Sequence, residues 1–182
     1  AVTLSAAAAE VALPAKKRVL FFTKSSGFEH EAIKLKTRNG SPGFAFAVME
    51  ALGAASNIEF TFSKDGSLFT ADYLAGFDAI VFYSTGDLTL AKSAPDLGDG
   101  NPPMSAAGKA ALLRAIESGK GFVGIHPASD TFHSSGDQID PYIRMLGGEF
   151  VAHEREQAAP QIVVDPKFLV MSAVPANFAP QE

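Results

Sequence analysis

Apolar residues occur along the chain in four short runs that are separated by segments with helical spacing. Three of these runs are nearly continuous and have polar ends, the pattern of strands buried on both faces. They cover residues 18–24, 78–85 and 121–126. A fourth run, residues 57–63, alternates apolar and polar side chains with the period of a strand. Four strands are therefore predicted.

The segments between these strands predict helices, which cover residues 43–52, 71–76 and 106–118. Ser105 is the expected N-cap of the third helix, and Gly119 follows its end. Right-handed crossovers then place the first, third and fourth strands side by side. We therefore expect an α/β fold, a flavodoxin-like, doubly wound and mostly parallel sheet with helices on both faces.

Two later regions add a long loop, a short helix and further strands to this prediction. Residues 86–104 form a long segment rich in glycine, proline and aspartate, and loops of this length are usually functional or disordered. Residues 141–146 predict a short helix that Gly147 ends. Further strands are predicted for residues 149–153 and 161–164.

The composition excludes several classes of protein. The formal charge of −5 argues against a nucleic-acid partner, which needs a clustered basic surface. No apolar run is long enough to span a membrane. Because the chain has no cysteine, thiol nucleophiles, disulfides and thiolate metal sites are excluded.

We expect a flexible N-terminal segment, residues 1–17, followed by a single domain, residues 18–182. The first nine residues are mostly small and apolar, like the end of a secretory signal, but the charged start of such a signal is missing. Export to the periplasm and a cytoplasmic location therefore both stay open, because the same residues fit a plain flexible terminus.

Three of the four histidines follow predicted strands: His30, His126 and His153. Ligands of open α/β sheets bind beyond the carboxyl ends of the strands, so we expect His30 and His126 to lie at one edge and carry acid–base chemistry. The alternatives are a buried His126 bonded to the backbone and a His30 that is only a polar loop residue. His133 lies in a Ser/Gly/Asp loop and is predicted to be solvated.

The residues that follow the strands carry a resemblance to a known family. They are residues 23–30, 77–82, 85–87, 119–126, 129–131, 142, 146–150 and 153. Over about residues 18–174, the chain resembles the trehalose-utilisation (ThuA-like) family, whose fold is that of class I glutamine amidotransferases. The segment from Gly124 to His126, with Asp130 and Thr131 after it, is the most specific part. The resemblance implies a role in disaccharide metabolism, often involving 3-keto sugars.

Two departures from the family pattern matter. Pro127 stands where the family more often has alanine, and the family's further strands and late Gly-His segment have no counterpart up to residue 182. The domain is therefore expected to lack the family's C-terminal part. His126 occupies the position of the nucleophilic cysteine of related amidotransferases. Glutaminase activity is excluded because a thioester mechanism needs a thiolate.

Several polar residues near the histidines are further candidates, most of them with a structural alternative. Asp130 either orients His126 or caps the following turn. Lys24 either binds an anionic or carbonyl oxygen or is a charge at a strand end. Asp87 either binds sugar hydroxyls or makes an Asx-turn. Thr131 is a further candidate for substrate binding.

Together these features favour an enzyme that acts on a small carbohydrate and transfers a proton next to a carbonyl. His126 is the expected base, and His30 and His153 polarise the carbonyl directly or through a divalent metal such as zinc. No cofactor is certain, because the short-spaced histidine pair typical of zinc sites is absent. The alternative is a non-catalytic carbohydrate-binding or interaction module, in which the histidines do not converge. Assembly into a homo-oligomer stays open.

Overall fold

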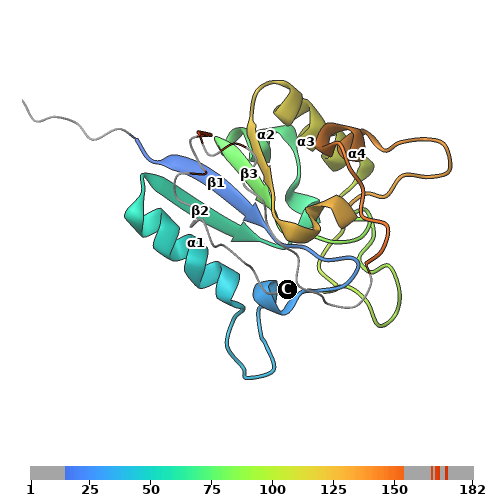
Figure 1. The fold of residues 1–182 in the computed structure, drawn as a ribbon, viewed down its shortest axis with the longest axis horizontal. Coiled ribbons are helices and arrows are strands. Elements are labelled where there is room, and N and C mark those ends of the chain that lie inside the picture. Colours follow the sequence, from blue (N-terminus) through green and yellow to red (C-terminus); the bar gives the residue numbers. More distant parts are fainter. Residues whose placement is uncertain (1–14, 154–164, 166, 169–170, 172–182) are drawn as a thin grey trace, which may run out of the picture. The chain divides into compact units, whose positions relative to one another are not determined.

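The computed structural model describes residues 15–153, 165, 167, 168 and 171. The chain divides into two compact units, Ala1–Phe150 and Val151–Glu182. All helices and strands of the described residues, except a turn near Met171, belong to the first unit (Figure 1). None of the helices in the described part of the chain is long and apolar enough to cross a membrane.

The first unit is built on one parallel sheet in the order β2-β1-β3-β4. Its strands are β1 (Lys17–Phe22), β2 (Ile58–Ser63), β3 (Ala79–Phe82) and β4 (Gly121–Gly124). The first, third and fourth strands lie side by side, which confirms the flavodoxin-like order predicted from the sequence. Strand β4 ends earlier than predicted because His126 already begins a 3-10 turn.

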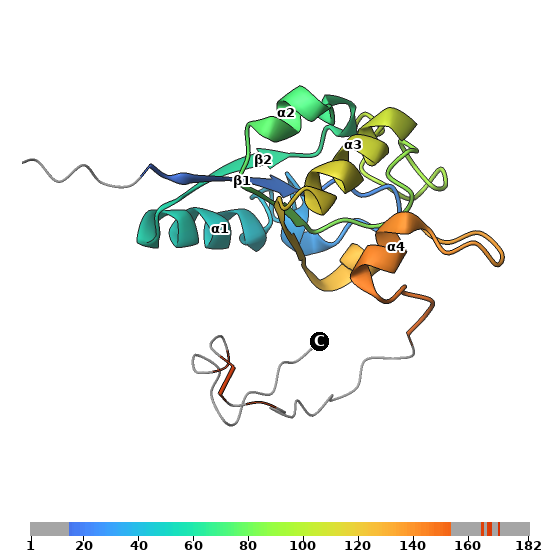
Figure 2. The same cartoon turned by 90° about the horizontal axis from the view of Figure 1, so that it is seen from above.

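Helices cover both faces of the sheet (Figure 2). They are α1 (Phe44–Ala55), α2 (Ala71–Ala75), α3 (Ala106–Glu117) and α4 (Pro141–Leu146), with the 3-10 turns η1 (Glu31–Ile33), η2 (Gly66–Leu68) and η3 (His126–Asp130). Alternate residues of β1 enter two cores. Leu20 and Phe22 pack with α2, α3 and α4, whereas Val19 and Phe21 pack with α1 and η1. Burial on both faces explains the continuous apolar runs.

The ends of three helices follow local chemistry. The Ser105 hydroxyl accepts a hydrogen bond from Gly108 N at 3.0 Å and caps α3, and Gly147, with φ of +82°, ends α4. Both ends agree with the sequence prediction. Helix α1 instead continues past Gly53, where an end was predicted, and its last turn is closed by a bond from Ser56 N to Gly53 O.

The predicted strand over residues 149–153 is wrong, because these residues have no regular secondary structure. The backbone N–H of Phe150 donates to Ser129 O at 3.0 Å, so this segment is bonded to η3 rather than to a strand. The predicted strand over residues 161–164 lies outside the described residues.

Candidate functional site

Two histidines and a tyrosine meet at the carboxyl ends of the strands. The ring centroids of His30 and His126 lie 4.7 Å apart, and the Tyr83 ring lies 5.9 Å from His30 and 6.0 Å from His126. The exposed ring of Phe28 packs edge-on against His30 at 5.0 Å. The sheet thus brings together His30 and His126, which are 96 positions apart in the sequence.

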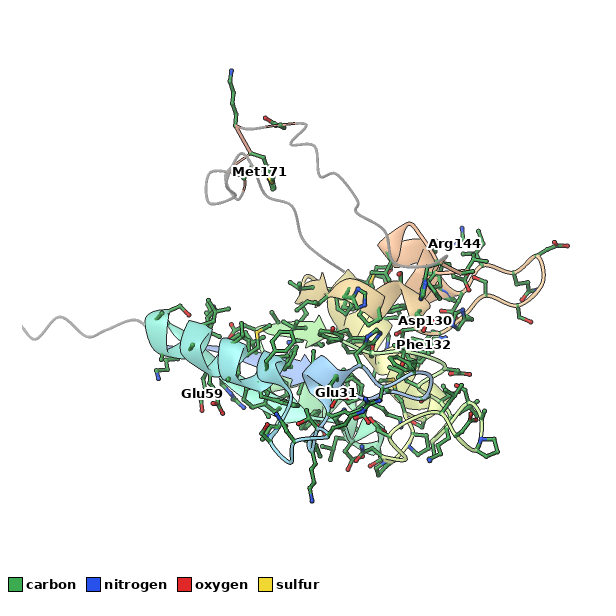
Figure 3. The ribbon with its side chains drawn as sticks, turned by 60° about the horizontal axis from the view of Figure 1, so that its bottom comes forward. Glu31, Glu59, Asp130, Phe132, Arg144 and Met171 are labelled. Atoms are coloured by element: carbon green, nitrogen blue, oxygen red, sulfur yellow. The ribbon has the colours of Figure 1, made fainter. Side chains whose placement is uncertain are left out.

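Each ring reaches this place from the end of a different strand. His30 lies between β1 and η1, Tyr83 directly follows β3, and His126 begins η3 just after β4. Figure 3 shows Asp130 of η3 at the same end of the sheet as Glu31 of η1, whereas Glu59 of β2 lies toward the other end. The cluster therefore occupies the edge at which open α/β sheets bind ligands.

The polar atoms of this cluster have no partners among the described residues. No hydrogen bond or ion pair within this part of the chain involves either imidazole or the Tyr83 hydroxyl. The interpretation of His126 as a buried histidine bonded to the backbone is wrong, since its side chain is exposed and unbonded.

The backbone at His126 adopts a conformation that is uncommon for residues other than glycine. Its φ is +44°, in the left-handed region, and it directly follows a strand and opens a short helical turn. Such strained strand-to-helix turns project a side chain above the end of a sheet. The turn is tight, since a Cβ on Gly124 would lie 3.1 Å from Ala128 Cβ.

Glycines allow the loops that follow β1 and β3 to approach each other. A Cβ on Gly86, whose φ is +74°, would lie 2.3 Å from the backbone nitrogen of Gly27. Any larger residue at position 86 would therefore push the loop that carries His30 away from the end of β3.

Burial, with the neighbouring His126 as a second cause, lowers the pKa of His30. As the pH falls below about 6.5, the ordinary value for histidine, the unfolded chain takes up a proton here before the folded chain does. The stability that depends on neutral His30 is therefore complete above that pH and is lost as the pH falls toward the folded pKa.

We expect an NMR titration of the imidazole signals to give His30 a midpoint below 6.5. In His126→Asn the midpoint should rise toward 6.5, because the neighbouring charge is removed. Glu117→Gln, an exposed change at the end of α3, is the control and should leave the midpoint unchanged. A His30 midpoint at or above 6.5 in the native protein would contradict this description of the pair.

No hydrogen bond or ion pair joins Asp130 to His126 within the described residues, and Asp130 instead pairs with His133. Its Oδ1 lies 2.8 Å from Nε2 of His133, and Nδ1 of the same ring lies 3.1 Å from Glu149 Oε1. Burial raises the pKa of Asp130, and His133 partly opposes that shift. His133, predicted to be solvated, is exposed, and its ring lies between two carboxylates.

Lys24 is not exposed to a ligand, which corrects its predicted role in binding an oxygen. Its side chain is fully buried, and Nζ donates to Asn101 O at 2.7 Å and lies 3.5 Å from Asp99 Oδ1. Lys64 Nζ lies 3.4 Å from the other Asp99 oxygen and 3.0 Å from Glu29. We call Lys24, Lys64, Asp99 and Glu29 the buried ion network, and it holds the long loop against the end of β1.

Thr131 and Asp87 are likewise engaged within the fold. Thr131 is fully buried and its hydroxyl donates to Ser84 O at 3.0 Å, so the predicted contact with substrate is wrong. Asp87 Oδ1 accepts from the backbone N–H of Thr89 at 2.9 Å, the Asx-turn that was the alternative interpretation.

No group of three or more histidine, aspartate or glutamate side chains within the described residues is arranged to hold a metal ion. His30 and His126 supply two adjacent imidazoles, and His153 belongs to the second unit. The three-histidine zinc site therefore stays a prediction.

His126 also lines an open pocket of about 350 Å³. The other lining residues are Gly124, Ala128, Ser129, Leu146, Gly148, Glu149 and Phe150. They come from the end of β4, from η3, and from the end of α4 with the segment that follows it. The imidazole of His126 thus connects the histidine pair to a cavity.

The sequence interpretation missed two residues of this site, Tyr83 and Glu149. Tyr83 is the last apolar residue of the third predicted strand, and its position beside the polar loop was the available signal. Glu149 was assigned to a strand that does not form, so its carboxylate was not considered.

Comparison with known proteins agrees with this architecture. The crystal structure of a ThuA-like protein from Bacteroides uniformis is similar, with a TM-score of 0.64 and 18% identity. The match covers 96% of this chain and 62% of that protein, so this chain spans less than two thirds of its length. No curated protein matches the chain. The sequence pattern of the family described as trehalose utilisation matches residues 18–182. The chain belongs to the trehalose-utilisation (ThuA) family.

Proposed function

We propose that the protein is an enzyme that transfers a proton at the carbon next to the carbonyl of an oxidised sugar, such as a 3-keto glycoside. His126 takes this proton on a neutral imidazole nitrogen. The electrons of the broken C–H bond move toward the carbonyl, whose oxygen becomes negative. In a 3-keto glycoside, the enolate can then re-form the carbonyl and make a carbon–carbon double bond as the C–O bond to the glycosidic oxygen breaks, and that oxygen takes up the proton held by His126.

His30 and Tyr83 are proposed to stabilise the negative oxygen with hydrogen bonds. A neutral imidazole donates from one nitrogen, and the lowered pKa of His30, caused by burial and by His126, favours that form. Burial raises the pKa of Tyr83, so its hydroxyl stays a donor at neutral pH.

The observation that carries this proposal is the pair of imidazoles 4.7 Å apart with unbonded nitrogens. The description of the family supports a sugar as the substrate. A non-catalytic binding module, the alternative, predicts that the histidines do not converge, so their proximity favours the enzyme.

We expect Tyr83→Phe to lower kcat for a 3-keto glycoside on the order of 10²-fold, because one donor to the negative oxygen is lost. Product formation by NMR or chromatography measures this effect. Tyr73→Phe is the matched control. Tyr73 lies on α2 and packs against the core that contains Leu20 and Phe22, on the opposite side of the sheet from the core next to Tyr83, so this variant should keep native kcat. A native protein that converts no 3-keto glycoside would contradict the proposed function.

A further inference from the structure

The pocket beside His126 is lined by both apolar and polar side chains. Leu146 and Phe150 provide apolar surface, and Ser129 and Glu149 provide a hydroxyl and a carboxylate. No lysine or arginine lines it. A sugar ring has matching features, because its C–H groups are apolar and its hydroxyls are hydrogen-bond donors.

Ser134 and His133 hold the carboxylate of Glu149 in place. Oε1 accepts from the backbone N–H of Ser134 at 2.8 Å and lies 3.1 Å from Nδ1 of His133. These bonds with Ser134 and His133 hold the pKa of Glu149 below its usual range, so the carboxylate is charged at neutral pH. A carboxylate has about four acceptor positions, so the interactions with Ser134 and His133 leave room for a further hydrogen-bond donor.

His133 connects this carboxylate to the turn that carries His126. Its Nε2 lies 2.8 Å from Asp130, the last residue of η3, while Nδ1 faces Glu149. The backbone N–H of Phe150 also donates a hydrogen bond to Ser129 O at 3.0 Å, and both residues line the pocket. The position of Glu149 relative to His126 is therefore set by bonds that pass through His133.

We propose that this pocket is a binding site for an uncharged, polyhydroxylated ligand, in which a ligand hydroxyl donates to the carboxylate of Glu149 and His133 is the positioning residue for that carboxylate. The inference rests on the proposed function and deepens it, because the pocket then holds a part of the sugar remote from the reacting carbonyl. Two carboxylates beside the cavity and no lining lysine or arginine disfavour an anionic ligand such as a phosphorylated sugar.

The test compares trehalose with trehalose 6-phosphate as probes of the full chain, with binding measured by ligand-observed NMR titration. Native protein should bind trehalose at least about tenfold more tightly than the phosphate. Glu149→Gln should weaken trehalose binding by about tenfold and reduce this preference, because a hydrogen bond to a charged group is weakened. Glu117→Gln, at the exposed end of α3, is the matched control and should change neither affinity.

His133→Ala separates a positioning role from a merely structural one. It should weaken trehalose binding in the native background but cause no further loss in the Glu149→Gln background, because His133 acts through that carboxylate. Thermal melting checks that each variant is folded. Losses that multiply in the double variant would overturn the positioning role.

Two results would overturn the binding site itself. One is a native protein that does not bind trehalose or binds both probes equally, and the other is a Glu149→Gln variant with native affinities. Turnover of 3-keto glycosides is a separate outcome. Binding without turnover would contradict the proposed proton transfer and support the pocket, whereas turnover without binding of trehalose would overturn the pocket alone.

Discussion

Replacing His126 with alanine is expected to lower turnover of a 3-keto glycoside by about 10²–10⁴-fold, the usual effect of losing a general base. The fold should survive, because the side chain is exposed and unbonded within the described residues. A structural histidine would instead cost up to about 3 kcal/mol of stability through its unpaired partners. Kinetics and thermal melting, measured on the same samples, distinguish these two outcomes.

The backbone of His126 calls for a second variant. Its φ of +44° suits asparagine better than alanine, so His126→Asn keeps the turn while removing the base. Both variants should lose about 10²–10⁴-fold in turnover, and the asparagine variant should melt close to the native temperature. A variant that melts much earlier but keeps its specific activity would make His126 a structural residue.

Asp99→Ala should destabilise the protein by about 3–5 kcal/mol, the range for removing one partner from a buried ion pair. Asp99 is the only carboxylate near both Lys24 and Lys64 in the buried ion network. Removing Asp99 leaves the buried ammonium groups of Lys24 and Lys64 without the carboxylate that lies near both of them. Urea unfolding followed by circular dichroism measures the loss, and the melting temperature should fall by roughly 10 °C.

Two control variants make this prediction specific. Asp96→Ala changes an exposed carboxylate of the same loop and should stay within about 0.5 kcal/mol of native stability. Lys24→Met should cost less than Asp99→Ala, since Asp99 then keeps Lys64 as a partner. If Asp99→Ala and Asp96→Ala unfold at the same urea concentration, the ion network does not stabilise the loop.

The fold was predictable because local and global signals agree. The apolar runs gave the strands and their parallel order, and Ser105 and Gly147 marked helix ends through capping and left-handed backbone. The proximity of His30 and His126 followed from this order alone, since the carboxyl ends of parallel strands share one edge.

The misassigned residues depend on contacts set by the conformation of loops and turns, which the sequence pattern does not predict. Lys24 is buried only because the loop with Asp99 folds back over β1. Asp130 meets His133 three positions later across a turn at Phe132, whose φ of +54° is unusual for a bulky aromatic residue. Patterns of single residues do not reveal such pairings.

The central claim is that His126 removes a proton from carbon next to a sugar carbonyl. Its most direct test is deuterium exchange at that carbon, followed by proton NMR of a 3-keto glycoside incubated with the protein in D₂O. We predict that native protein replaces this proton much faster than the uncatalysed reaction, and that His126→Asn exchanges at the uncatalysed rate. Exchange by native protein at the uncatalysed rate, or equal exchange by native protein and the variant, would contradict the claim.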